Sequence, residues 1–96
     1  GLVMAVPDEE IKDAKALIGK YGLGCEPASA ATIAGLRHLL AEGTVDKNER
    51  VACVLTGHVL KDPGLTVDYH TKSEGEFSNP PKQAPNDLGE IIKLIK

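Results

Sequence analysis

Two short apolar runs, at residues 2–6 and 51–55, enclose two stretches of helical periodicity, and this order constrains the fold more than any other feature. A run that is apolar at every position is typical of a strand buried on both faces, since a strand with one solvent-facing side alternates. Such strands alternate with helices in parallel sheets. The sequence therefore predicts an α/β fold, a three-layer parallel-sheet segment in β-α-β-α-β order followed by a C-terminal helix.

Apolar residues at three- and four-residue steps predict a first helix, for which Asp8 offers an N-cap and Gly22 a C-terminal stop. Residues 23–26 form a brief extended connection, because the residue before a proline is disfavoured in helical backbone. Pro27 then suits the first position of a second helix, which runs to Glu42 and is buried on much of its circumference.

Composition sets the size and character of the core. With 96 residues the chain holds one domain at most, and its aromatic content of 3% requires closely packed Ala, Val, Ile and Leu. We expect residues 1–63 to form the main α/β unit, residues 64–87 a polar loop and residues 88–96 a terminal helix capped by Asn86 or Asp87. The apolar face of this helix must dock on another surface, and it consists of Leu88, Ile91, Ile92 and Ile95.

The net charge is −3 and no Lys/Arg cluster is long enough to follow a row of phosphates, so we expect no nucleic-acid partner. No apolar run approaches the roughly 20 residues that span a bilayer, so we expect no membrane partner and a cytoplasmic protein. Cys25 and Cys53 have the neighbours of reduced packing thiols. The histidines, at positions 38, 58 and 70, have no metal-ligand spacing, so we expect no metal.

Two motifs make the chain identifiable. Residues 26–31 read Glu-Pro-Ala-Ser-Ala-Ala, and residues 51–61 read Val-Ala-Cys-Val-Leu-Thr-Gly-His-Val-Leu-Lys, followed by Asp62 and Pro63. Their pairing resembles the C-terminal part of threonine synthases, where Glu-Pro-Ala-Ser-Ala-Ala precedes Leu-Thr-Gly-His-Gly-Leu-Lys-Asp-Pro. These enzymes depend on pyridoxal 5'-phosphate and belong to the tryptophan-synthase-like (fold type II) group. The resemblance spans roughly residues 1–63 and implies that they are the C-terminal part of the cofactor-binding α/β domain.

The resemblance implies conversion of O-phosphohomoserine and water to threonine and phosphate, by β,γ-elimination and replacement, in an enzyme that is a homo-oligomer. It also implies that Thr56 hydrogen-bonds the pyridine nitrogen of the cofactor and that Gly57 lets the backbone approach the ring. The residues implied to line the substrate site are Glu26, Pro27, Ala28, Ser29 and His58.

The chemistry of these residues allows two interpretations. Thr56 directly follows a predicted strand, at the rim where α/β sheets bind ligands, and a neutral hydroxyl there makes the cofactor a weaker electron sink than a carboxylate would. His58, with an unperturbed pKa of about 6.5, suits proton transfer. Alternatively, Thr56 bonds local backbone at a strand end, Glu26 and Ser29 cap the second helix, and His58 is a solvent residue.

Two positions of the second motif need comment. Val59 stands where the family has glycine, and a β-branched residue tolerates positive φ poorly. Lys61 and Asp62 match the family, but adjacent opposite charges on a loop are usually solvated and worth little.

The lysine that binds pyridoxal phosphate as a Schiff base is not found in its family context, Ser-x-Lys-Asp, and the Gly/Asn-rich phosphate loop is also missing. We therefore expect no catalytic residue in this segment, expect both features upstream in a longer parent enzyme, and expect the segment alone to be inactive. An apolar run that begins directly after Gly1 is consistent with the end of a longer polypeptide.

Two kinds of alternative remain open at this stage. One is another fold type II lyase, either a serine/threonine dehydratase or a cysteine-synthase-like enzyme. The other is a non-catalytic, stand-alone module that binds a ligand or forms oligomers.

Overall fold

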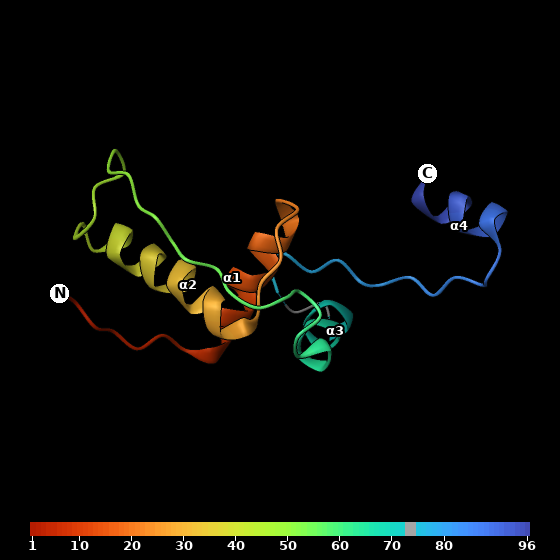
Figure 1. The fold of residues 1–96 in the computed structure, drawn as a ribbon, viewed down its shortest axis with the longest axis horizontal. Coiled ribbons are helices and arrows are strands. Elements are labelled where there is room, and N and C mark those ends of the chain that lie inside the picture. Colours follow the sequence, from red (N-terminus) through yellow and green to blue (C-terminus); the bar gives the residue numbers. More distant parts are fainter. Residues whose placement is uncertain (73–74) are drawn as a thin grey trace.

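Four helices and the extended segments between them form the chain in the structure, a computed structural model that describes residues 1–72 and 75–96 (Figure 1). The helices are α1 (Asp8–Lys20), α2 (Pro27–Ala41), α3 (Pro63–Lys72) and α4 (Leu88–Ile95). Helices α1 and α2 pack against each other, α3 contacts α1, and α4 lies apart at one end of a molecule 52 Å long.

The two long helices begin and end close to their predicted bounds. The N-cap residue of α1 is Pro7, in extended backbone, so the prediction that Asp8 is the cap is wrong by one position. Gly22 follows α1 with φ 77°, which confirms it as the stop. Pro27 is the first residue of α2, as predicted, and Gly43 follows that helix with φ 76°.

The core lies between α1 and α2 and is built from small side chains. Ala14 of α1 and Ala30 and Ala34 of α2 are 0–1% exposed, and the other buried members are Ile18 and Cys25. Alanine at the contact lets two helices approach closely, so little side-chain volume is needed to exclude water. This agrees with the core expected from the low aromatic content. The partly buried residues around it are Val6, Ile11, Ile33 and Leu55.

Both cysteines are free thiols, as the sequence suggested. Cys25 is buried at the start of the connection into α2, and Cys53 is half-buried in the extended segment that follows residue 50. A buried thiol in such a position acts as a small apolar residue.

The predicted α/β fold is wrong for the described residues, which are helical and contain no strand. Residues 2–6 and 51–55 are extended, as expected, but they form no ladder with each other or with residues 23–26. Val3 is 99% exposed and Val54 is 74% exposed. An extended apolar segment becomes a strand only when a neighbour about 4.8 Å away offers its backbone groups, and neither segment has such a neighbour in the described part of the chain.

Helix α3 was missed, because residues 64–87 were predicted to be a polar loop. The helix contains few apolar residues, and Pro63 and Gly64 at its start suggested a turn. Contact with α1 supplies what the sequence pattern lacks, since the Tyr69 hydroxyl donates to Asp13 Oδ1 at 2.6 Å. Burial, together with this hydrogen bond, raises the pKa of Tyr69 to about 12, so the phenol stays protonated near neutral pH.

Helix α4 has the predicted cap, because Asp87 Oδ1 accepts a hydrogen bond from Glu90 N at 3.0 Å. Its apolar side chains remain accessible, with Leu88 73% and Ile95 78% exposed. The division into residues 1–63, 64–87 and 88–96 stays a prediction. Across the described ranges, no helix is both long and apolar enough to cross a bilayer.

Enlarging a side chain at the α1–α2 contact should destabilise the protein. Ala34 is 1% exposed, so Ala34→Leu should lower the free energy of unfolding by about 1–3 kcal/mol through overpacking. The matched control is Ala41→Leu, at an exposed position of the same helix, which should change that free energy by less than about 0.5 kcal/mol. Urea unfolding followed by circular dichroism measures both, and equal effects would contradict the assignment of the core.

Candidate functional site

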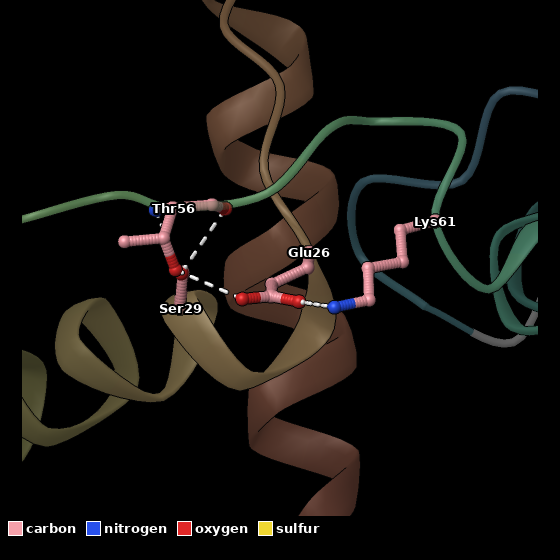
Figure 2. Close-up of polar contacts among 4 residues, drawn as sticks. All are labelled: Glu26, Ser29, Thr56 and Lys61. Carbon is pink, nitrogen blue, oxygen red and sulfur yellow. Dashed lines mark hydrogen bonds and ion pairs between the residues drawn. The ribbon is translucent and has the colours of Figure 1, made fainter.

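Four polar side chains meet where the segment that ends at Thr56 crosses the first turn of α2 (Figure 2). Glu26 and Ser29 come from the start of α2, Thr56 from the crossing segment, and Lys61 from the turn that follows it. We call these four residues the Thr56 cluster.

Backbone contacts hold Thr56 in this position. Its N–H donates to Ser29 Oγ at 2.8 Å, and its carbonyl oxygen accepts from the Glu26 N–H at 3.1 Å. Ser29 is 6% exposed, so the hydroxyl that anchors Thr56 is itself fixed within the core. The orientation of Thr56 therefore depends on the first turn of α2 rather than on its own neighbours in sequence.

The Thr56 side chain is bonded to two other side chains. Its hydroxyl donates to Glu26 Oε1 at 2.8 Å, and its oxygen lies 2.7 Å from Ser29 Oγ. These bonds join Thr56 to a segment that lies far from it in sequence. Glu26 is the N-cap residue of α2, but it makes no side-chain cap bond.

Lys61 completes the cluster by donating from Nζ to Glu26 Oε2 at 2.5 Å (Figure 2). The Glu26 side chain is 18% exposed and that of Lys61 62% exposed. The hydrogen bond from Lys61, followed by that from Thr56, lowers the pKa of Glu26, and burial opposes this only in part. The same contact raises the pKa of Lys61. Glu26 is thus an ionised hydrogen-bond acceptor at neutral pH.

Gly57 makes the close approach of Glu26 possible. Its φ is 68°, and a Cβ at this position would lie 2.7 Å from Glu26 Cβ. Both the left-handed backbone and the available space therefore require glycine here. The group that lies against Gly57 in the structure is Glu26, and the approach of this backbone to a cofactor ring stays a prediction.

The remaining predicted site residues lie around the cluster. His58 is exposed, its Nδ1 accepts from Leu60 N at 3.1 Å, and its carbonyl accepts from Lys61 N at 3.0 Å, so it shapes the turn that presents Lys61. Pro27 and Ala28 instead line a separate hollow of about 280 Å³, between α1, the start of α2 and α3. The structure thus brings Glu26, Ser29, Thr56 and Gly57 together, but not Pro27 and Ala28 with them.

Val59 is accommodated without backbone strain. It has no positive φ, and its side chain occupies the space that a Cβ on Gly24 would need, 2.6 Å from Val59 Cβ. The absence of a side chain at Gly24 is what allows valine at this position.

Lys61 is the member of the cluster that the sequence analysis did not recognise. Its neighbour Asp62 suggested a solvated charge pair, whereas its partner is Glu26, 35 residues earlier. The available signal was the match of Lys61 to the family motif, which says that a lysine belongs there but not what it contacts.

The cluster fits the nitrogen end of a pyridine ring. Thr56 is exposed, and its neutral hydroxyl, which Glu26 and Ser29 hold from the start of α2, is the type of group that hydrogen-bonds a ring nitrogen. No geometry of a bound ring follows from this, but the residue types are those that such a ring needs.

Comparison with known proteins first gives the class of this chain, because the proteins that align with its whole length are synthases. It is 52% identical to threonine synthase of Methanocaldococcus jannaschii, across 97 residues, and 41% identical to that of Halalkalibacterium halodurans, across 100 residues. It is 30% identical, across 100 residues, to threonine synthase 2, chloroplastic, of Arabidopsis thaliana. No family model matches the chain.

The chain is therefore homologous to a segment of the threonine synthases, and the resemblance drawn from the two motifs is confirmed. It spans 22% of the Methanocaldococcus protein, 25% of the Halalkalibacterium protein and 19% of the Arabidopsis protein. The chain thus spans about a fifth to a quarter of the length of these relatives.

Replacing Gly57 should disturb the cluster through contact as well as through backbone strain. Gly57→Ala should cost about 1–2 kcal/mol for the left-handed conformation, and a further amount because the new methyl meets Glu26. The matched control is Gly43→Ala, where φ is 76° but no atom lies within 4 Å of the added Cβ. Urea unfolding compares the two, and an equal loss in both variants would show that the contact with Glu26 has no energetic weight.

Acid should weaken the cluster through Glu26. Because the pKa of Glu26 is lower in the folded protein than its ordinary value of 4.5, its stabilising contribution is complete above that value. The contribution is lost as pH falls through the lowered pKa. The free energy of unfolding, measured against pH, should therefore fall further in the wild type than in Glu26→Gln. Glu9→Gln, at an exposed ion pair with Lys12, should retain the wild-type dependence.

Proposed function

We propose that this chain is the C-terminal part of a threonine synthase that converts O-phosphohomoserine and water to threonine and phosphate. The reaction is a β,γ-elimination and replacement that depends on pyridoxal 5'-phosphate. Identity of 41–52% with threonine synthases over the whole chain supports the enzyme class. The single observation that supports a part in the site is the accessible Thr56 hydroxyl, held by side chains from distant segments.

In this proposal pyridoxal phosphate, when bound, supplies the electron withdrawal that lets bonds at the α-carbon of an amino acid break. Thr56 hydrogen-bonds the ring nitrogen, and Ser29 and Glu26 orient Thr56. Gly57 leaves the space that Glu26 requires. His58 lies in the exposed turn next to Thr56, where its side chain is available to the substrate.

The remaining functions belong to parts of the enzyme beyond this segment. The Schiff-base lysine and the phosphate-binding loop are proposed to lie upstream, so the segment alone is proposed to be inactive. Cytoplasmic location and assembly into a homo-oligomer are proposed from the family resemblance alone.

The proposal predicts the substrate of the enzyme that contains this segment. The purified full-length protein with pyridoxal phosphate should release phosphate from O-phosphohomoserine and form threonine. Thr56→Val should reduce kcat by at least about tenfold, since it removes the bond to the ring, whereas Thr44→Val in the exposed connection should leave kcat unchanged. Phosphate release and threonine formation are both measured. Turnover of serine, threonine or O-acetylserine without phosphate release would favour a dehydratase or cysteine-synthase-like enzyme. If the protein turns over none of these compounds and no O-phosphohomoserine, the result would favour a binding module.

A further inference from the structure

A larger hollow, of about 610 Å³, lies between α1, α3 and residues 76–79, and we call it the Lys15 hollow. One face of α1 forms a wall of it with three lysines and two small residues, namely Lys12, Lys15, Ala16, Gly19 and Lys20. The small residues bring little side-chain volume, and a Cβ added at Gly19 would lie in open space. None of the four residues of the Thr56 cluster lines this hollow, so it is separate from the candidate site described above.

Lys15 lines the hollow with a buried cation. The residue is 7% exposed, and among the described residues its ammonium contacts the Val59 carbonyl oxygen, 3.5 Å from Nζ. That distance exceeds the about 2.7–3.2 Å of ordinary N–H···O bonds, and an ammonium has three protons to donate. A buried ammonium is unfavourable unless acceptors surround it. Lys15 therefore has donors to offer to a group inside the hollow.

Helix α3 adds a second unsatisfied group to the same hollow. Thr66 lines it, and Thr66 Oγ1 is buried without a hydrogen-bond partner in the described part of the chain. Buried hydroxyls are nearly always hydrogen-bonded in folded proteins, so each exception needs an explanation. Two such groups, one from α1 and one from α3, are explained together by an acceptor that enters the hollow.

Another part of the lining is apolar. Phe77, Leu23 and Leu65 contribute to it, and Phe77 is held in place because its N–H donates to the Tyr69 hydroxyl at 3.3 Å. Lys20 Nζ lies 5.6 Å from the centre of the Phe77 ring, so a cation adjoins the apolar surface. The hollow thus offers both polar donors and an apolar surface to one ligand.

Positive charge exceeds negative charge around the hollow. The carboxylate that lines it is Glu76, which is exposed, and Lys12 is paired outside it with Glu9 at 2.6 Å. Within the described residues, Lys15 and Lys20 form no ion pair with a carboxylate. A recessed site that carries excess positive charge raises the local concentration of anions.

We propose that the Lys15 hollow binds a small phosphate monoester. Its phosphate accepts hydrogen bonds from Lys15 and Thr66, and its organic part lies against the apolar surface. A phosphate monoester carries about −1.5 to −2 charge at pH 7 and has three strong acceptor oxygens. The protons of Lys15, Lys20 and Thr66 outnumber the roughly four acceptor positions of a carboxylate, so a phosphate matches the hollow better. The inference goes beyond the proposed reaction and does not depend on it.

The test is calorimetric titration of the full-length protein, loaded with pyridoxal phosphate, with phenyl phosphate as the probe. Lys15→Met removes the ammonium and keeps the length of the side chain, and it should weaken binding about 10- to 100-fold, as expected for hydrogen bonds to a charged group. Thr66→Val should weaken binding roughly 2- to 10-fold. The control Lys47→Met removes an exposed lysine outside the hollow and should leave the affinity unchanged.

Thermal unfolding of the same variants separates loss of the site from damage to the fold. Without phenyl phosphate, Lys15→Met should have a Tm no lower than that of the wild type, because a buried charge is replaced by an apolar side chain. Phenyl phosphate should raise the Tm of the wild type more than that of the variant. Thr66→Val keeps the shape of its side chain, so its weaker binding reports the lost hydroxyl.

Three results would overturn the inference. The first is equal affinity for phenyl phosphate in the wild type and in Lys15→Met. The second is a loss of affinity in Thr56→Val that Lys15→Met does not show, since binding would then belong to the Thr56 cluster. The third is inorganic phosphate binding as tightly as phenyl phosphate, because the apolar surface would then contact no ligand.

Discussion

The contact between α1 and α2 is the constraint on which the rest of this structure depends. It is made by alanines, so the two helices approach closely, and the connection between them is short enough to bury Cys25. This places the first turn of α2, with Ser29 buried against the core, at a defined position beside the crossing segment. The site is thus built on the best-packed part of the chain, which is what an accurate arrangement of polar groups requires.

The polar cluster differs from the ion pairs on the helices. Pairs such as Glu9 with Lys12 and Glu90 with Lys93 join residues three positions apart on one helix and are exposed, so they contribute little. The bonds of Glu26 instead join segments 30 and 35 residues away along the chain, and its side chain is mostly buried. These bonds hold distant segments of the chain together. The charged group that makes them, the Glu26 carboxylate, also accepts the hydrogen bond from Thr56.

The sequence predicted those features that depend on local chemistry. The stop at Gly22, the start at Pro27 and the cap at Asp87 follow from backbone preferences that act within a few residues. The failures concern features that depend on distant partners. Apolarity at residues 2–6 and 51–55 predicted a sheet, but pairing needs neighbours, and α3 forms through its contact with α1 rather than through its own pattern.

The candidate site was predictable in its members but not in its connections. Family motifs named Glu26, Ser29, Thr56 and Gly57, and the structure brings these residues together. No pattern in the chain indicates that the Thr56 proton is donated to Glu26, or that Lys61 bonds the same carboxylate. Such facts depend on the crossing of two segments, which periodicity does not encode.

The isolated position of α4 has a thermodynamic consequence. Helices shorter than about 12–15 residues are marginal in water on their own, and α4 has eight residues, one side-chain cap and an apolar face that α1, α2 and α3 do not cover. Its coil-to-helix equilibrium is therefore coupled to burial of that face, so that forming the helix and covering it are a single cooperative event.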